Sequence, residues 1–178
     1  NLAFLWVGLV GVKRMASLRI EEHPWPETVF YVGIFLTGVG SAYFHWNPNL
    51  NTLLWDRLPM TVGFMAFYCA MVQRGLRFRV PAYGLLFALV VGAWSVLHWS
   101  NTEAAGAGDL RFYMVVQFLP MLLLPILFLG WPSEKVKYLW CMLGLYAIAK
   151  VCEHFDHEIA AWMPLEITGH ALKHLFAA

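Results

Sequence analysis

The residues best suited to chemistry in this sequence are three histidines from two distant parts of the chain, His45, His170 and His174. His170 and His174 are four residues apart, so a helix places both imidazoles on one face. A histidine pair at this spacing can bind one metal ion. Three histidines and an open position form a catalytic zinc arrangement, with zinc–nitrogen distances of about 2.0–2.1 Å. We therefore predict a zinc site made by these three imidazoles, with water as the fourth ligand.

Two further polar side chains are expected at the same depth as the metal. Ser41 precedes His45 by four residues and shares its helix face, and Asp56 stands at the beginning of the next apolar run. Ionisable groups within apolar helices are energetically costly and usually mark function. We therefore expect Ser41 and Asp56 to lie in the same layer of the bundle as the three histidines.

The elements that must position these residues are apolar runs separated by short polar breaks. They cover residues 1–12, 28–45, 53–72, 81–99, 110–129, 138–153 and 167–178. The middle five approach the roughly 20 residues that a membrane-spanning helix needs. The first and last, at 12 residues each, would extend only about 18 Å. The pattern predicts an all-α membrane protein, a seven-transmembrane-helix bundle whose first and last helices are clipped in this chain, and a single domain over residues 1–178.

The composition agrees with a protein that is solvated by lipid. Hydrophobic residues make up 60% of the 178 residues and charged residues 13%, whereas a soluble domain carries about 25% charged residues. The net charge is +1, and most lysines and arginines flank the apolar runs. They form no basic face for nucleic acid. The expected partners are therefore the bilayer and a lipid substrate, and the sequence indicates no particular protein partner.

The basic residues predict an orientation in the membrane. The odd-numbered connections hold most of them: Lys13, Arg14, Arg19, Arg74, Arg77, Arg79, Lys135 and Lys137. The even-numbered connections have only Arg57 and Arg111 at their edges. Because cytoplasmic loops are enriched in lysine and arginine, we expect a multi-pass protein with its C-terminus in the cytoplasm. The N-terminus and the zinc site are then extracytoplasmic.

Two stretches of the sequence resemble a known family. Residues 40–45 read GSAYFH and residues 56–60 read DRLPM. This pattern is similar to the alkaline ceramidases and to the wider CREST-type superfamily of seven-helix membrane hydrolases, which includes the adiponectin receptors. Its members carry Ser-x-x-x-His in the second helix, Asp at the start of the third and His-x-x-x-His in the seventh. All five positions are present in this sequence, in the same order.

The resemblance implies roles for the five residues. His45, His170 and His174 would bind zinc, Asp56 would take or relay the proton of the activated water, and Ser41 would help to hold the oxyanion. Zinc can lower the pKa of its water to about 7, a carboxylate can pass a proton to the leaving amine, and a hydroxyl can stabilise developing negative charge. The implied activity is that of a zinc-dependent hydrolase that cleaves the amide bond of ceramide or a related N-acyl lipid.

Two other family elements bear on the site. Residues 150–158 look like a family segment, in which Glu153 and Asp156 would support the site from outside the set of zinc ligands. Eukaryotic alkaline ceramidases also carry an acidic, calcium-binding segment before the first helix. This chain is expected to start inside that helix, so calcium is not assigned as a cofactor.

Two alternatives to a hydrolase stay open. A receptor-like member of the superfamily would carry the same five positions with a structural zinc, although Gly40, Pro59 and Met60 favour the ceramidase branch. A metal or proton transporter could use histidine and aspartate as a relay. A transporter predicts ionisable residues in both halves of the bundle, and the sequence indicates an apolar inward half.

Overall fold

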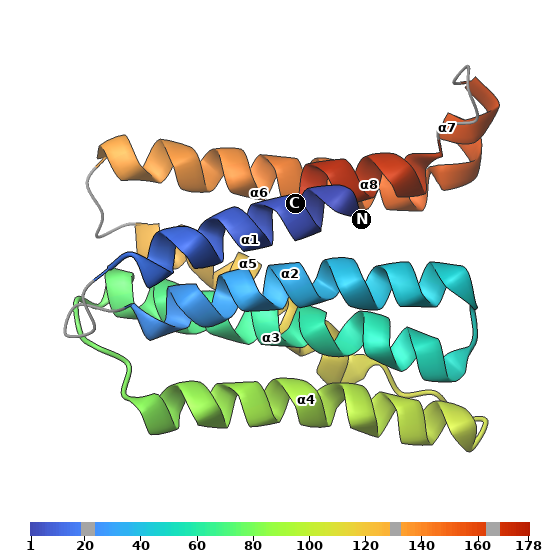
Figure 1. Ribbon diagram of the computed structural model, residues 1–178, viewed down its shortest axis with the longest axis horizontal. Helices are drawn as coiled ribbons and strands as arrows, with labels where there is room; N and C mark the ends of the chain where they lie inside the picture. Colours follow the sequence, from blue (N-terminus) through green and yellow to red (C-terminus); the bar gives the residue numbers. More distant parts are fainter. Residues whose placement is uncertain (19–23, 129–132, 163–167) are drawn as a thin grey trace. The chain divides into compact units, whose positions relative to one another are not determined.

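The computed structural model describes residues 1–18, 24–128, 133–162 and 168–178, and within these ranges the chain is helical with no strand. The helices are α1 (Leu2–Ala16), α2 (Trp25–Trp46), α3 (Leu50–Gly75), α4 (Ala82–Ala104), α5 (Arg111–Phe128), α6 (Ser133–His154), α7 (Asp156–Trp162) and α8 (Gly169–Ala177). The predicted all-α class is therefore confirmed. The chain divides into two compact units, Leu2–Gly130 and Trp131–Ala178, which are drawn in Figure 1 and are described separately. The seven-helix bundle and the single domain remain predictions.

The predicted apolar runs fall within helices, and one helix was not predicted. Six of the runs coincide with α1 to α6 and the last coincides with α8. The unpredicted helix is α7, which begins directly after Phe155 and carries Asp156 and Glu158 in its first turn. An acidic first turn suits a helix N-terminus, but seven residues are too few to show a clear apolar period. The predicted positions Arg19, Leu129 and Ile167 lie outside the described residues.

Small residues bring the first three helices of the Leu2–Gly130 unit close together. Helices α1, α2 and α3 lie side by side in Figure 1. A Cβ atom added to Gly33 of α2 would lie only 2.6 Å from the backbone nitrogen of Gly63 of α3. A Cβ atom on Gly38 would lie 3.1 Å from the backbone nitrogen of Leu5 of α1. Glycine allows helix backbones to approach in this way, which is common between membrane helices.

Two apolar clusters join α3 to α4 and α5 in the same unit. One is formed by the buried residues Met65, Ala66, Cys69, Leu85, Ala88 and Val116. The other is formed by Val96, Trp99 and Tyr113, with Leu50, Leu53, Leu54, Leu58 and Leu110 packed against them. The second cluster lies where α3 begins, so it fixes the part of α3 that carries Asp56.

The basic residues lie closer to the helices than the sequence predicted. Lys13 and Arg14 stand in the last turn of α1, and Arg74 stands in the last turn of α3 rather than in the following connection. Lys135 and Lys137 likewise lie within the bounds of α6. The prediction of loop positions was wrong because α1 and α3 end after their apolar runs and α6 begins before its run. For α1 and α3, cations in the last turn also interact favourably with the helix dipole.

An ion pair ties α2 to α3 at this end of the unit. Arg74 Nε and Nη2 each lie 2.9 Å from Oε1 of Glu27, whose side chain is largely buried. The pair joins the beginning of α2 to the end of α3. The opposite end of these two helices carries His45 and Asp56.

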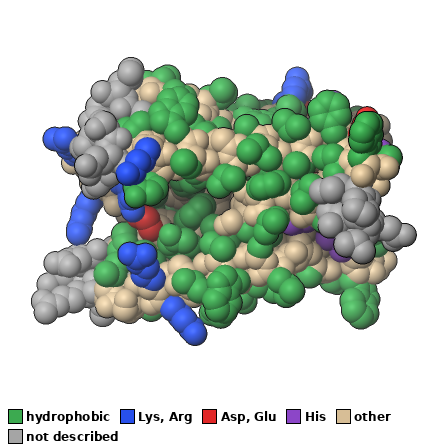
Figure 2. All heavy atoms as spheres, turned by 90° about the horizontal axis from the view of Figure 1, so that it is seen from above, with side chains coloured by type: hydrophobic (Ala, Val, Ile, Leu, Met, Phe, Trp, Pro, Cys, Tyr) green, Lys and Arg blue, Asp and Glu red, His purple; other side chains and the backbone are tan. Residues whose placement is uncertain are grey.

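Among the described residues, two helices are long and apolar enough to cross a membrane. These are α2 and α4, whereas the apolar part of α5 is shorter. Large hydrophobic side chains are exposed along the helices, among them Trp6, Leu86, Phe87 and Val90. Hydrophobic side chains are also spread over the face drawn in Figure 2. Such extensive apolar exposure is rare on soluble monomers.

Candidate active site

The imidazoles of His170 and His174 converge in the Trp131–Ala178 unit. Both lie on α8, and their Nε2 atoms are 3.0 Å apart. The ring centroids are 4.7 Å apart and the ring planes are inclined by 70°. Two ligands held about 2.0–2.1 Å from a tetrahedral ion would lie about 3.3 Å from each other. The predicted pair therefore has nearly the donor spacing that one zinc ion requires.

Local contacts fix the start of α8, where this pair begins. The Thr168 hydroxyl caps the helix by accepting a hydrogen bond from the backbone of Ala171 at 3.1 Å. The Asp156 carboxylate accepts another from the backbone of His170 at 2.6 Å. A Cβ atom on the buried Gly169 would strike the carbonyl oxygen of Cys152 in α6. Together these contacts hold the first turn of α8 against the end of α6 and the start of α7.

Glu153 contacts the same helix through an ion pair with Lys173. Its carboxylate accepts hydrogen bonds from Lys150 at 2.7 Å and from Lys173 at 3.0 Å. Lys173 immediately precedes His174, so Glu153 connects α6 to the turn of α8 that carries the second imidazole. Glu153 and Asp156 thus both contact α8 directly, and their support of a bound metal remains a prediction.

Ser41 and His45 lie in the last two turns of α2, in the Leu2–Gly130 unit. Ser41 is only 1% exposed, whereas His45 is exposed, with its ring centroid 5.4 Å from that of Phe44. Their spacing of four residues places them on one side of the helix. The buried hydroxyl therefore lies one helical turn before the exposed imidazole along α2.

Asp56 lies on the side of α3 that faces α2. A Cβ atom on Gly40 would strike the carbonyl oxygen of Trp55 and would lie 3.4 Å from the Cα atom of Asp56. Gly63, which also approaches α2, follows Asp56 by seven residues and so lies on the same helix face. Gly40 is the neighbour of Ser41. The structure therefore places Ser41 and Asp56 at one level of the α2–α3 pair.

A short connection sets the relation between His45 and Asp56. Residues 47–49 separate α2 from α3. The Asn49 side chain accepts a hydrogen bond from the backbone of Thr52 at 3.0 Å, and the Thr52 hydroxyl accepts one from the backbone of Asn49, also at 3.0 Å. This capping box starts α3. This cap was not predicted, although Asn49 and Thr52 have the spacing that signals it in the sequence.

The five predicted residues are thus divided between the two units. Ser41, His45 and Asp56 belong to Leu2–Gly130, whereas His170 and His174 belong to Trp131–Ala178. The roles of these residues in metal binding and catalysis stay predictions. The convergence of all three histidines on a single ion stays a prediction.

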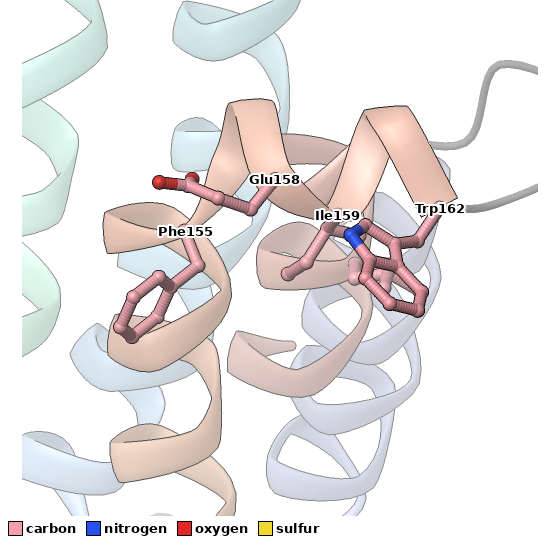
Figure 3. Close-up of a pocket in the computed structure, with 5 residues that line it drawn as sticks. Phe155, Glu158, Ile159 and Trp162 are labelled. Carbon is pink, nitrogen blue, oxygen red and sulfur yellow. The ribbon is translucent and has the colours of Figure 1, made fainter.

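A hollow of about 360 Å³ lies beside α8, on the far side from the histidine pair. Figure 3 shows Phe155, Glu158, Ile159 and Trp162 around it, and Leu172 completes its lining. Leu172 is two residues from both His170 and His174, so its side chain leaves α8 on nearly the opposite face. The hollow is therefore separate from the side of α8 that carries the two imidazoles.

Fold and site together define a class of protein. It is an all-helical protein with apolar helices that carry a paired-imidazole site, a carboxylate and a buried hydroxyl, which are the groups found in metal-dependent hydrolases. The sequence matches the Ceramidase family over residues 1–128, and the chain belongs to this family. No curated protein and no solved structure matches the chain. Family membership supports a ceramidase-like hydrolase that acts on an amide bond of a lipid.

The contact at Gly40 leads to a stability prediction. Replacing Gly40 with valine should lower the free energy of unfolding by about 1–3 kcal/mol, because overpacking forces backbones apart. The side chain would meet the backbone of Trp55, which cannot rotate away. The measurement is the thermal unfolding midpoint of the purified protein in detergent.

The same substitution at Gly144 provides a matched control. Gly144 lies within α6, and no described atom lies within 4 Å of the Cβ atom that a side chain would add there. Gly144→Val should leave the midpoint nearly unchanged. Equal midpoints for both variants would show that α2 and α3 do not approach closely at Gly40.

Proposed function

We propose that this protein is a zinc-dependent membrane hydrolase that cleaves the amide bond of ceramide or a related N-acyl lipid, releasing a fatty acid and an amine. The observation that carries the proposal is the match to the Ceramidase family over residues 1–128, which include Ser41, His45 and Asp56. The same match favours a hydrolase over a receptor-like member of the superfamily.

The donor set suits zinc. His170 and His174 present two imidazole nitrogens 3.0 Å apart, and His45 is the third ligand in the proposal. Imidazole is a common zinc ligand, and three protein ligands leave a position open for catalysis. When bound, zinc would activate a water molecule and polarise the carbonyl of the substrate.

The other residues handle the proton and the developing charge. In the proposal, Asp56 accepts a proton from the attacking water and delivers it to the amide nitrogen. The water oxygen forms a bond to the carbonyl carbon, the carbon–nitrogen bond breaks, and the amine leaves with the delivered proton. The Ser41 hydroxyl donates a hydrogen bond to the carbonyl oxygen as negative charge develops on it. Its burial removes competing water, which strengthens this interaction.

The apolar helices support a substrate that arrives from lipid. Helices α2 and α4 are long and apolar enough to span a bilayer, and α2 carries both Ser41 and His45. We propose a multi-pass arrangement with the N-terminus and the zinc site on the extracytoplasmic side and the C-terminus in the cytoplasm. An amphiphilic substrate could then keep its alkyl chains in the bilayer while its amide reaches the end of α2.

The test is a hydrolysis assay with labelled ceramide. The full-length protein in detergent or vesicles should release labelled fatty acid, a zinc chelator should stop the release, and added zinc should restore it. Release that continues after verified removal of zinc would exclude the metal mechanism. Failure to cleave ceramide or other N-acyl lipids with zinc bound would exclude the proposed activity.

A further inference from the structure

The residue after Asp56 has a contact that the proposed mechanism does not use. The guanidinium carbon of Arg57 lies 3.9 Å from the centroid of the Trp99 ring and 5.3 Å from that of Tyr113. Trp99 belongs to α4 and Tyr113 to α5, and both are almost fully buried. Arg57 therefore joins the first turns of α3 to two neighbouring helices through cation–π contacts.

The Arg57 head group lies against these two aromatic rings. Its Nη1 atom is buried and has no hydrogen-bond partner among the described residues. Arg111, which lies at the same end of the unit, makes a contrasting contact. Its Nε and Nη2 atoms donate to the Asp109 carboxylate at 2.9 and 2.8 Å, and the guanidinium keeps the pKa of Asp109 well below its usual range.

The contacts around Arg57 continue along the same face of α3. The Tyr113 hydroxyl lies 3.8 Å from the sulfur of Met60, and Leu58 packs against the Trp99 and Tyr113 cluster. On the other side of α3, the backbone at Trp55 and Asp56 lies against Gly40 of α2. The start of α3 is therefore held between α2 on one side and α4 and α5 on the other.

We propose that Arg57 is a positioning residue that sets the rotation of the first turns of α3 and so directs Asp56 toward α2. Successive helical residues point about 100° apart, so fixing the direction of Arg57 also fixes the direction of Asp56. This inference rests on the proposed role of Asp56 as the proton carrier. It assigns to Arg57 no contact with the substrate or with zinc.

A planar guanidinium suits this task better than an ammonium group. It can lie flat on the indole ring of Trp99, whereas lysine presents a flexible point charge. Arg57→Lys keeps the charge and should reduce kcat by less than Arg57→Met does. Arg57→Met keeps a side chain of similar reach without charge and should reduce kcat by about tenfold to about a hundredfold, because small misplacements of catalytic groups have effects of this size.

The kinetic test is a double-substitution cycle with full-length protein. Arg57→Met should lower kcat with KM and zinc content unchanged. In the Asp56→Asn background, Arg57→Met should have no further effect, because its effect acts through Asp56. The matched control is Arg111→Met, which removes an exposed guanidinium at the same end of the unit and should leave kcat unchanged.

A second readout does not depend on activity. In protein with Cys69, Cys141 and Cys152 replaced by serine, Ser41→Cys and Asp56→Cys are introduced together and joined with a short bifunctional reagent. Cross-linking should fall several-fold when Arg57→Met is added and should be unaffected by Arg111→Met. In variants that remain folded, this measurement reports the direction of position 56 even if no amide is hydrolysed.

The outcomes separate this inference from the proposed function. A further tenfold loss caused by Arg57→Met in the Asp56→Asn background, or unchanged cross-linking, would overturn the positioning role and leave the hydrolase proposal standing. Failure of the wild-type protein to hydrolyse any N-acyl lipid would remove the hydrolase proposal. Reduced cross-linking in that case would still support the effect of Arg57 on the direction of α3.

Discussion

Replacement of His170 or His174 with alanine is expected to abolish both zinc binding and amide hydrolysis. The two Nε2 atoms lie 3.0 Å apart, so one zinc ion would contact both, and losing either ligand leaves too few donors for a stable site. The measurements are zinc content by metal analysis and fatty-acid release from labelled ceramide. Retained turnover in either variant would exclude the zinc mechanism.

A neighbouring histidine provides the control for these variants. His157 lies on α7 in the same unit, is exposed, and is not among the predicted ligands. His157→Ala should keep both zinc and activity. His45→Ala tests the remaining ligand, because zinc binding should fall in this variant only if α2 contributes to the site. Unchanged zinc content and activity in His45→Ala would show that the metal is bound by the Trp131–Ala178 unit without help from α2.

Replacement of Asp56 with asparagine is expected to slow hydrolysis by about a hundredfold to about ten-thousandfold, which is the usual contribution of a positioned acid–base group. Zinc content should not change, because Asp56 is not one of the proposed ligands. Asparagine has nearly the same size as aspartate, so contacts between α2 and α3 around Gly40 should be preserved. The measurements are kcat and KM together with metal content.

Glu27 provides a carboxylate control for Asp56. It lies on α2 at the opposite end of the α2–α3 pair, where it binds Arg74. Glu27→Gln should lower stability and leave the rate of the folded enzyme largely intact. An equal rate in Asp56→Asn and wild type would remove Asp56 from the chemistry and, with it, the reason for Arg57 to act through that residue.

Several features of this protein followed from local sequence patterns. Apolar runs predicted the helices because the period and length of such runs reflect burial in an apolar environment. The spacing of His170 and His174 predicted their convergence because residues four apart in a helix share a face, and the structure confirms that convergence. The same local reasoning missed α7, which is too short for a period, and placed Lys13, Arg14 and Arg74 in connections instead of helix ends.

The sequence by itself determined the helical class and the imidazole pair, because each of these depends on residues that are close together in the chain. The match over residues 1–128 established the membership in the Ceramidase family without the tertiary structure. Only the tertiary structure showed that Gly40 brings α2 against Asp56, that Asp156 binds the backbone of His170, and that Trp99 and Tyr113 hold Arg57. These contacts join residues from different helices. They depend on how whole helices pack, and no local pattern of residues specifies the register and rotation at which two helices meet.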